Sequence, residues 1–360
     1  MFYIFFIIIV NQICQTYHLI KLNAICKKGI IMEQLISVVT GGNGFVGSHL
    51  VDYLIKKGHE VRCIVRKSSD LKWLQNKNVK IFTCGLADRE ELGKIIKDAD
   101  YIYHVAGVVK SKKKEGYFKG NVEPTRNILD VCLKVNPKIR RILIVSSLTA
   151  CGPSKIGHPC NESTKENPIT TYGKSKFMQE QLSKSYFEKL PITIVRPPAV
   201  YGPRDTEIYL VFKTFQKGLM TLVGFNKKEL SLVHVSDLVH GIYLASISES
   251  SVGKTYFIGS DETTNWNSVS DILEKVFNKK ALKLRIPHII VYAIAAVAQF
   301  LSVFSNKPAT FNLEKAKDFV QEAWTCDISK AKNELGFQPS INIETGLRQT
   351  IEWYRAEKWL

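Results

Sequence analysis

A glycine-rich turn constrains the fold of this chain more than any other feature of the sequence. Segment 36–50, ISVVTGGNGFVGSHL, passes from β-branched residues through Gly41, Gly42, Gly44 and Gly47 into a pattern with helical periodicity. Its spacing fits GxGxxG from Gly42 and GxxGxxG from Gly41. Side chains there would block the tight turn, keep a pyrophosphate off the backbone, or push the helix away from the strand. Because a strand precedes the turn and a helix follows it, the pattern favours dinucleotide binding over a simple loop.

The same region indicates which dinucleotide binds. The positive end of the helix would hold the phosphates near Asn43, Phe45 and Val46. A chain that uses NAD usually has an acidic residue about twenty positions further on, where the second strand ends. That strand ends here in Arg66 and Lys67, which would pair with the 2′-phosphate of NADP. The sequence therefore favours NADP as the cofactor. NAD is the alternative if Arg66 is only a solvated strand end.

Alternation of strands and helices follows this turn. Apolar, β-rich runs lie at 35–40, 60–65, 79–83, 100–105 and 141–146, and segments with helical periodicity separate them. A helix over about 170–189 and a strand from Ile192 to Arg196 continue the pattern. Parallel strands need crossover helices, so the pattern predicts an α/β fold with a doubly wound parallel sheet, the Rossmann arrangement.

The alternation weakens beyond Gly202. We expect a nucleotide-binding domain over residues 32–202 and a smaller, mixed and mostly helical substrate-binding lobe over 203–360. Elements of this lobe would interleave with the last parts of the sheet. The pattern predicts helices at 207–219 and 236–248, strands at 231–235 and 254–258, and a mostly helical C-terminus.

Residues 1–31 form a leader that we expect to lie outside the fold. The run Met1–Val10 is apolar, but it is too short to span a bilayer and no basic residue precedes it. A second methionine, Met32, stands directly before the first strand and is the favoured native start. The alternative is a short membrane anchor.

Composition narrows the classes of partner. The net charge is +17, but the lysines are scattered and form no arginine-rich stripe, so we expect no nucleic acid partner. The eight cysteines show no CxxC pair and no histidine at zinc-ligand spacing. We therefore expect no metal, and reduced thiols in a cytoplasmic protein.

An apolar segment at 286–304 raises the question of membrane contact. Its length is borderline for a membrane span, and Pro287 would stand at the start of a helix. We expect a buried or pocket-lining helix. Peripheral contact with a membrane is the alternative.

A tyrosine and a lysine four residues apart indicate proton-transfer chemistry. Tyr172 and Lys176 would share one helix face, and the ammonium would lower the pKa of the phenol toward neutrality. The phenol could then exchange a proton with a carbonyl or alcohol oxygen. Ser147 ends the strand before this helix, on the edge that faces the ligand crevice in such sheets. It could bond the same oxygen, or it could be satisfied by the backbone.

Together these segments resemble the extended short-chain dehydrogenase/reductases over Met32–Leu360. The matching stretches are TGGNGFVG at 40–47, YHVAG at 103–107, the paired serines 146–147, YGKSK at 172–176 and RPPAVYGP at 196–203. The resemblance implies a catalytic triad of Ser147, Tyr172 and Lys176, in which Tyr172 is the acid/base and Lys176 also holds the nicotinamide ribose. It implies too that the cofactor lies near His104, Ala106, Gly107, Pro197 and Val200.

Two further positions are read from the resemblance. Asn121 matches the family's asparagine at the start of the helix after the fourth strand. Segment 84–88, with Leu86, would face the adenine, but Gly85 stands where members usually carry an aspartate. Many relatives dimerise through a helix pair that includes the tyrosine helix, so the resemblance also implies a homodimer.

The family contains nucleotide-sugar epimerases and dehydratases, and also reductases similar to dihydroflavonol reductases and 3β-hydroxysteroid dehydrogenases. Pro198 and Leu230 stand where many sugar enzymes carry asparagine and arginine. We therefore expect an NADP-dependent oxidoreductase of an apolar secondary alcohol or ketone, steroid-like or aromatic. The alternatives are a sugar epimerase or dehydratase with retained NAD, and a non-catalytic NADP-binding sensor.

Overall fold

The computed structural model describes residues 34–304, 309 and 311–360. The leader 1–31 and the proposed start at Met32 lie outside these residues. Residues Leu35–Leu360 form one compact unit. Within the described part of the chain, no helix combines the length and the apolar character needed to cross a membrane. The six cysteines in this part are all free.

Seven parallel strands form the central sheet, in the order β10-β6-β5-β4-β1-β2-β3. Their bounds are β1 Ile36–Thr40, β2 Glu60–Val65, β3 Val79–Thr83, β4 Tyr101–His104, β5 Arg141–Val145, β6 Ile192–Arg196 and β10 Lys254–Phe257. The strand order reverses between β1 and β4, which leaves a crevice at their carboxyl ends. The predicted doubly wound sheet is confirmed.

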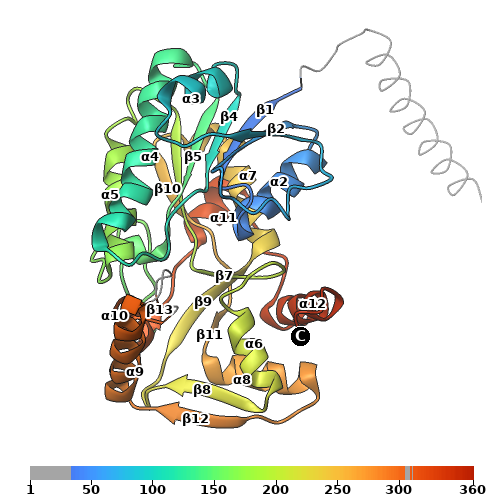
Figure 1. Ribbon diagram of the computed structural model, residues 1–360, viewed down its shortest axis with the longest axis vertical. Helices are drawn as coiled ribbons and strands as arrows, with labels where there is room; N and C mark the ends of the chain where they lie inside the picture. Colours follow the sequence, from blue (N-terminus) through green and yellow to red (C-terminus); the bar gives the residue numbers. More distant parts are fainter. Residues whose placement is uncertain (1–33, 305–308, 310) are drawn as a thin grey trace, which may run out of the picture. The chain divides into compact units, whose positions relative to one another are not determined.

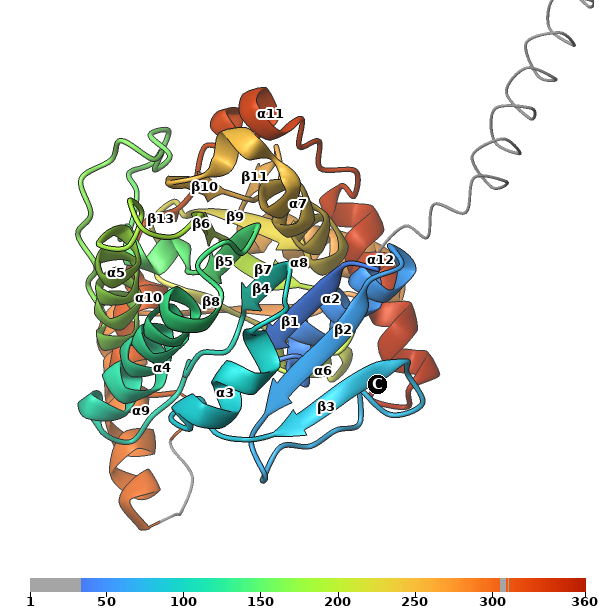
Figure 2. The same ribbon diagram turned by 90° about the horizontal axis from the view of Figure 1, so that it is seen from above.

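Helices cover both faces of the sheet (Figures 1 and 2). On one face lie α3 Arg89–Ile96, α4 Lys114–Val135 and α5 Thr171–Lys184, and on the other α2 Phe45–Lys56, α7 Val235–Ile247 and α11 Ser329–Leu335. Alternate strand residues point to opposite faces, so Val38 and Val39 enter two separate cores. Although they come from beyond Gly202, α7, α11 and β10 complete the sheet and its outer layer.

A second set of elements forms a smaller lobe below the carboxyl end of the sheet in Figure 1. Strand β9 Glu229–His234 pairs with β7 Ala199–Tyr201, β11 Thr263–Thr264 and β13 Ala323–Trp324, while β8 Leu219–Val223 pairs with β12 Leu282–Ile286. The helices here are α6 Tyr209–Gln216, α8 Trp266–Phe277, α9 His288–Leu301, α10 Leu313–Val320 and α12 Ile343–Ala356, with the 3₁₀ turns η1 Leu148–Ala150, η2 Glu249–Ser251 and η3 Ser302–Phe304. Buried aromatic residues, among them Phe212, Phe215 and Tyr354, fill its core.

The lobe differs from the sequence prediction in two places. The helix expected over 207–219 ends at Gln216, because Gly218 takes a positive φ of 92° and turns the chain into β8. The C-terminal part is mostly helical, as expected, but it also holds the unpredicted strand β12. The alternation of Leu282 and Leu284 with basic residues is a strand pattern, but it is too short to stand out.

Segment 286–304 forms α9 and η3, and the prediction of a buried helix is wrong. Only Val291 and Ala295 are buried within α9. The pocket-lining part of the prediction holds, since Ile286, Val291 and Ile294 line a cavity of about 340 Å³ in the lobe.

Candidate active site

The glycine turn is shaped by close backbone contacts. Gly41 has a φ of +72°, and a Cβ there would lie 2.8 Å from the Cα of Ala106, on the segment after β4. A Cβ at Gly47 would lie 2.1 Å from the carbonyl oxygen of Gly41. Both positions therefore require glycine, and the turn brings the start of α2 against the end of β4.

The start of α2 is open to an anionic ligand. Gly44 is its N-cap, no side chain caps it, and its first turn contains no acidic residue. The N–H groups around Phe45 and Val46 thus lack a side-chain partner from the cap, at the positive end of the helix dipole. These features fit the pyrophosphate of a dinucleotide.

The basic residues after β2 lie in a loop that reaches the glycine turn. Arg66 and Lys67 are exposed, and the Arg66 N–H donates to Ser69 Oγ at 3.1 Å. The Asn43 side chain donates to the Asp70 carbonyl oxygen at 3.3 Å, which links this loop to the turn. Asp70 is the acid in the loop, and its carboxylate accepts the N–H of Lys72.

The structure brings two of the three predicted catalytic residues, Ser147 and Tyr172, into contact. Thr170 caps α5 by accepting the N–H of Gly173, and this places Tyr172 in the first turn of the helix. The Tyr172 hydroxyl bonds to Ser147. Ser147 Oγ also accepts from the Thr149 N–H at 3.2 Å and the Thr149 hydroxyl at 2.9 Å. Thr149 thus occupies both acceptor positions of Ser147 Oγ, so the Ser147 hydroxyl hydrogen is the one that bonds Tyr172.

Lys176 is buried one turn further along α5. Its Nζ donates to the Val145 carbonyl oxygen at 2.7 Å and to Gln179 Oε1 at 2.6 Å, which leaves one N–H. A Cβ at Gly107 would lie 3.6 Å from this Nζ, so the segment after β4 passes close to the ammonium. Burial lowers the pKa of Lys176 to about 8, although Glu180 raises it.

The prediction that Lys176 lowers the pKa of Tyr172 toward neutrality is wrong for the protein without its cofactor. Burial raises the pKa of Tyr172 to about 12; the bond to Ser147 lowers it, and Asp318 and Tyr117 raise it. The Lys176 ammonium is instead held by Val145 and Gln179. The ligand-free phenol is therefore a proton donor at neutral pH.

A chain of buried hydrogen bonds connects the crevice to Lys176. The Ala106 N–H donates to Thr40 Oγ1 at 3.2 Å, and Thr40 bonds to His104 Nδ1 at 2.8 Å. His104 Nε2 bonds to Thr125 Oγ1 at 2.9 Å, and Thr125 donates its hydroxyl hydrogen to the Asn121 carbonyl. Thr125 must therefore accept, which places the His104 proton on Nε2.

The same chain extends to α5. Gln179 Nε2 donates to Thr125 Oγ1 at 2.8 Å, while its Oε1 accepts from Lys176. Burial lowers the pKa of His104 to about 3, and Lys176 lowers it further, so the imidazole is neutral. Asn121 holds the segment after β4 by bonding both polar groups of the Val108 backbone, and it donates to Ser175 on α5. The sequence pattern does not indicate Thr125 and Gln179, because isolated polar residues on helices follow no recognisable spacing.

The remaining predicted cofactor positions lie at the carboxyl edge of the sheet. Pro197 follows β6, and its carbonyl oxygen accepts the Leu148 N–H; Val200 lies half-buried on β7. The Leu86 carbonyl oxygen accepts from Asn127 on α4 at 3.0 Å. At Gly85 the nearest heavy atom to a Cβ would be 3.9 Å away, so no steric reason requires glycine there.

Asp318 on α10 is a site residue that the sequence did not reveal. Its Oδ1 is buried and finds no hydrogen-bond partner in the part of the chain that the structure describes. Burial raises the pKa of Asp318 to about 7, with Glu314 raising it further, and the Asp318 charge in turn raises the pKa of Tyr172. Helix α10 reaches the site because Glu314 accepts the backbone N–H of Thr171.

Comparison with known proteins agrees with this geometry. The NAD-dependent epimerase/dehydratase family matches residues 37–259. A ceramide reductase from Caulobacter vibrioides is 26% identical, and the alignment covers 89% of this chain and 95% of the relative. The human decarboxylating sterol-4-alpha-carboxylate 3-dehydrogenase is also 26% identical, over 93% of this chain and 92% of that enzyme.

Solved structures share the fold. The crystal structure of gox2253 has a TM-score of 0.75 at 26% identity, covering 89% of this chain and 98% of the other. A UDP-glucose 4-epimerase from Thermotoga maritima, solved with UDP-glucose, has a TM-score of 0.73 at 22% identity, covering 90% and 100%. With the glycine turn, the doubly wound sheet and the Ser-Tyr-Lys arrangement, these matches show that the chain is an enzyme of the NAD-dependent epimerase/dehydratase family, within the extended short-chain dehydrogenase/reductases.

Proposed function

We propose that this enzyme transfers a hydride between NADP(H) and a secondary alcohol or ketone of an apolar, steroid-like or aromatic substrate. The observation that carries the proposal is the cavity of about 340 Å³ in the lobe. It is lined chiefly by apolar residues: Leu210, Val211, Leu219, Met220, Val223, Trp266, Ile286, Val291, Ile294, Phe311 and Phe319. A pocket of this size and character suits an apolar small molecule.

Helix α10 contacts both the cavity and the segment that carries Tyr172. Lys315 and Phe319 line the cavity, while Glu314 on the same helix contacts Thr171, next to Tyr172. The charged lining residues Glu207 and Lys315 pair with each other at 2.5 Å, and Lys110 also pairs with Glu207. Their charges are therefore neutralised locally, which leaves the apolar walls to select the substrate.

The residues have distinct roles in ketone reduction. NADPH, when bound, supplies the hydride. The Tyr172 phenol transfers its proton to the substrate oxygen as negative charge develops on it. Lys176 and Ser147 stabilise the resulting phenolate. The carbonyl oxygen becomes the hydroxyl of the product alcohol, and Tyr172 regains a proton from water.

The names of two relatives support an apolar substrate, because ceramide and sterols are lipids. Exposed Arg66 and Lys67 support NADP over NAD. We place the enzyme in the cytoplasm, and we infer a homodimer that packs through α4 and α5. Light scattering in solution tests that assembly.

Turnover provides the direct test. The purified enzyme should oxidise NADPH faster than NADH with a panel of apolar ketones. Tyr172→Phe should reduce the rate by about 100- to 10,000-fold while NADPH binding, followed by its fluorescence, is kept. Turnover at the wild-type rate after this change would disprove the acid/base role.

A second candidate is a nucleotide-sugar epimerase or decarboxylase that retains NAD. It is favoured by a UDP-N-acetyl-alpha-D-glucosaminuronate decarboxylase from Bacillus cytotoxicus, 26% identical over 88% of this chain. Mass spectrometry of the nucleotide released from freshly purified protein separates the two. Retained NAD supports the sugar enzyme, and readily exchanged NADP supports the reductase.

A further inference from the structure

Helix α9 and the turn η3 present an apolar surface that the rest of the described chain leaves uncovered. Segment 286–304 contains no Asp, Glu, Lys or Arg. A surface helix normally directs charged residues outward. Here Ile289 is 78% exposed, Phe300 64% and Phe304 80%. An all-apolar helix with this exposure is expected to contact something other than water.

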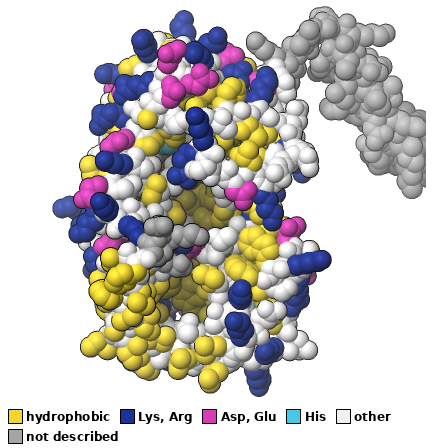
Figure 3. Space-filling model, viewed as in Figure 1, with side chains coloured by type: hydrophobic (Ala, Val, Ile, Leu, Met, Phe, Trp, Pro, Cys, Tyr) yellow, Lys and Arg dark blue, Asp and Glu magenta, His cyan; other side chains and the backbone are white. Residues whose placement is uncertain are grey.

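The surface continues onto strand β12. Leu282 and Leu284 are 70% and 48% exposed, and they share one face of the strand. In the space-filling view, hydrophobic side chains gather over α9 at the lower left (Figure 3). We call the exposed residues of β12, α9 and η3 the α9 surface: Leu282, Leu284, Ile289, Ile290, Ile294, Val297, Phe300, Leu301, Val303 and Phe304.

Basic residues lead into the α9 surface. Residues 279–304 include Lys279, Lys280, Lys283 and Arg285, and no acidic residue, although Lys283 pairs with Asp271 and Glu274 on α8. Lys279 and Lys280 are exposed in the turn that leads into β12. Basic residues next to an exposed apolar helix are typical of proteins that lie on anionic membranes. This complementarity favours lipid over a protein partner.

The length of α9 determines how it would meet a bilayer. Its 14 residues make a helix about 21 Å long, shorter than the roughly 30 Å hydrocarbon core. It would lie in the plane of the interface. The same helix forms a wall of the lobe cavity through Val291 and Ile294.

We propose that the α9 surface docks the enzyme on the face of an anionic lipid bilayer, from which the apolar substrate enters the lobe cavity. The second part rests on the proposed function, since only an apolar substrate would be dissolved in the bilayer. The first part rests on the exposure and charge of residues 279–304 alone.

Vesicle flotation of the full chain tests the docking. Wild-type protein should float with phosphatidylcholine vesicles that contain phosphatidylglycerol. The triple variant Ile289→Ser, Phe300→Ser, Phe304→Ser should bind at least tenfold more weakly. Replacing Lys279 and Lys280 with glutamine should weaken binding by roughly fivefold per lysine. A control variant with Ile81→Ser and Val252→Ser, partly exposed apolar residues elsewhere, should float like the wild type.

Three results would overturn the proposal. The wild type could stay unbound to the phosphatidylcholine vesicles that contain phosphatidylglycerol. The triple variant could float as well as the wild type, which would assign binding to another segment, the leader included. The triple variant could instead convert a dimer to a monomer in light scattering without lipid, which would make the α9 surface a contact between two copies. Thermal unfolding of the triple variant excludes loss of fold as the cause of weak binding.

Measurements of turnover distinguish a failure of the docking proposal from a failure of the proposed function. The triple variant should reduce a water-soluble ketone at the wild-type rate, because Ile289, Phe300 and Phe304 do not line the cavity. It should lose activity on a ketone dissolved in the vesicles. Flotation without any ketone turnover would leave the docking standing and refute the proposed function.

Discussion

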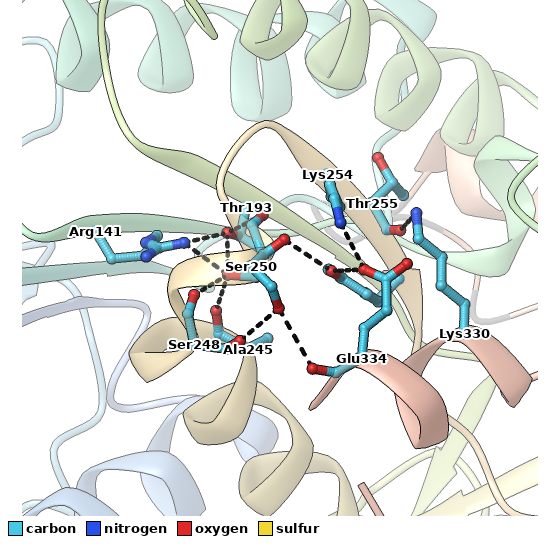
Figure 4. Close-up of polar contacts among 11 residues, drawn as sticks. Arg141, Thr193, Ala245, Ser248, Ser250, Lys254, Thr255, Lys330 and Glu334 are labelled. Carbon is cyan, nitrogen blue, oxygen red and sulfur yellow. Dashed lines mark hydrogen bonds and ion pairs between the residues drawn. The ribbon is translucent and has the colours of Figure 1, made fainter. Parts of the chain in front are cut away.

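The two ends of the central sheet each bury an arginine, and they satisfy it differently. At the carboxyl end, Arg196 pairs with Glu180 at 2.6 Å and with Glu166 at 2.9 Å. At the amino end, Arg141 donates to the hydroxyls of Ser251 and Thr193, at 2.6 and 3.2 Å (Figure 4). Its nearest carboxylate, on Glu249, is 4.0 Å away and almost fully exposed.

The electrostatic consequences differ as well. Burial lowers the pKa of Arg141. Burial also lowers that of Arg196, but Glu180 and Glu166 raise it by more. Glu180 lies one turn beyond Lys176 on α5, and it accepts from Ser146, beside Ser147, at 2.5 Å. The comparison teaches that a buried carboxylate anchors the helix that carries Tyr172 and Lys176, whereas neutral hydroxyls suffice at the opposite end.

The largest effect is expected from breaking the buried ion pair. Glu180→Gln leaves the Arg196 charge poorly compensated and should lower the free energy of unfolding by about 3–5 kcal/mol. The matched change at the amino end is Glu334→Gln. Glu334 pairs with partly exposed Lys254, so this variant should lower the free energy of unfolding by no more than about 1 kcal/mol. Urea unfolding measures both, and equal losses would contradict the distinction between the two ends.

Two glycines, one near each end of the sheet, allow the two ends to be compared for steric crowding. Gly47→Ala puts a methyl group 2.1 Å from the Gly41 carbonyl oxygen, so it should lower the free energy of unfolding by about 1–3 kcal/mol and abolish NADPH binding. Gly336, near the amino end, has a φ of +64° but no heavy atom within 4 Å of its Cβ position. Gly336→Ala should lower the free energy of unfolding by about 1 kcal/mol and leave NADPH binding unchanged. Binding retained by Gly47→Ala would refute the pyrophosphate site.

Asp318→Asn tests the carboxylate that acts on the catalytic tyrosine. Because its charge raises the pKa of Tyr172, removing it should move the alkaline limb of kcat/KM for ketone reduction to lower pH. An inflection near pH 7, where Asp318 ionises, should disappear. Glu334→Gln is the control with no charge change at this end of the sheet. A pH profile identical to the wild type would remove Asp318 from the site.

The smallest effect is expected at Gly85, where the family usually has an aspartate. Gly85→Asp has room for its side chain and should change stability by no more than about 0.5 kcal/mol. One added hydrogen bond to the adenine should tighten nucleotide binding by about two- to tenfold. Titration of NADPH fluorescence measures the change, and weaker binding would show that the adenine lies elsewhere.

The sequence predicted the sheet and the helix that carries both Tyr172 and Lys176, because both depend on local rules. A glycine forced by backbone contact, as at Gly41 and Gly47, cannot be replaced without changing the turn. Parallel strands are buried on both faces, so their apolar runs are easy to recognise. Tyr172 and Lys176 are linked by helix periodicity alone.

What the sequence could not reveal depends on burial and on contacts between distant segments. Tyr172 has a raised pKa because the fold removes water from it, which no spacing indicates. Asp318 reaches Tyr172 only through the packing of α10 over α5. The exposure of α9 was missed for the same reason, because an apolar helix in water is rare enough that burial is the usual outcome.

The direction of the hydrogen bonds from Ala106 to Asn121 bears on where a proton for Tyr172 can come from. Each O–H and N–H in that series points the same way, and the last acceptor is a peptide carbonyl rather than solvent. His104, with a pKa of about 3, cannot take up a second proton near neutrality. This series therefore braces the segment after β4 and offers no site that takes up a proton near neutrality. In the proposed reaction, Tyr172 would regain its proton from solvent at the open side of the cleft, the same side from which the product would leave.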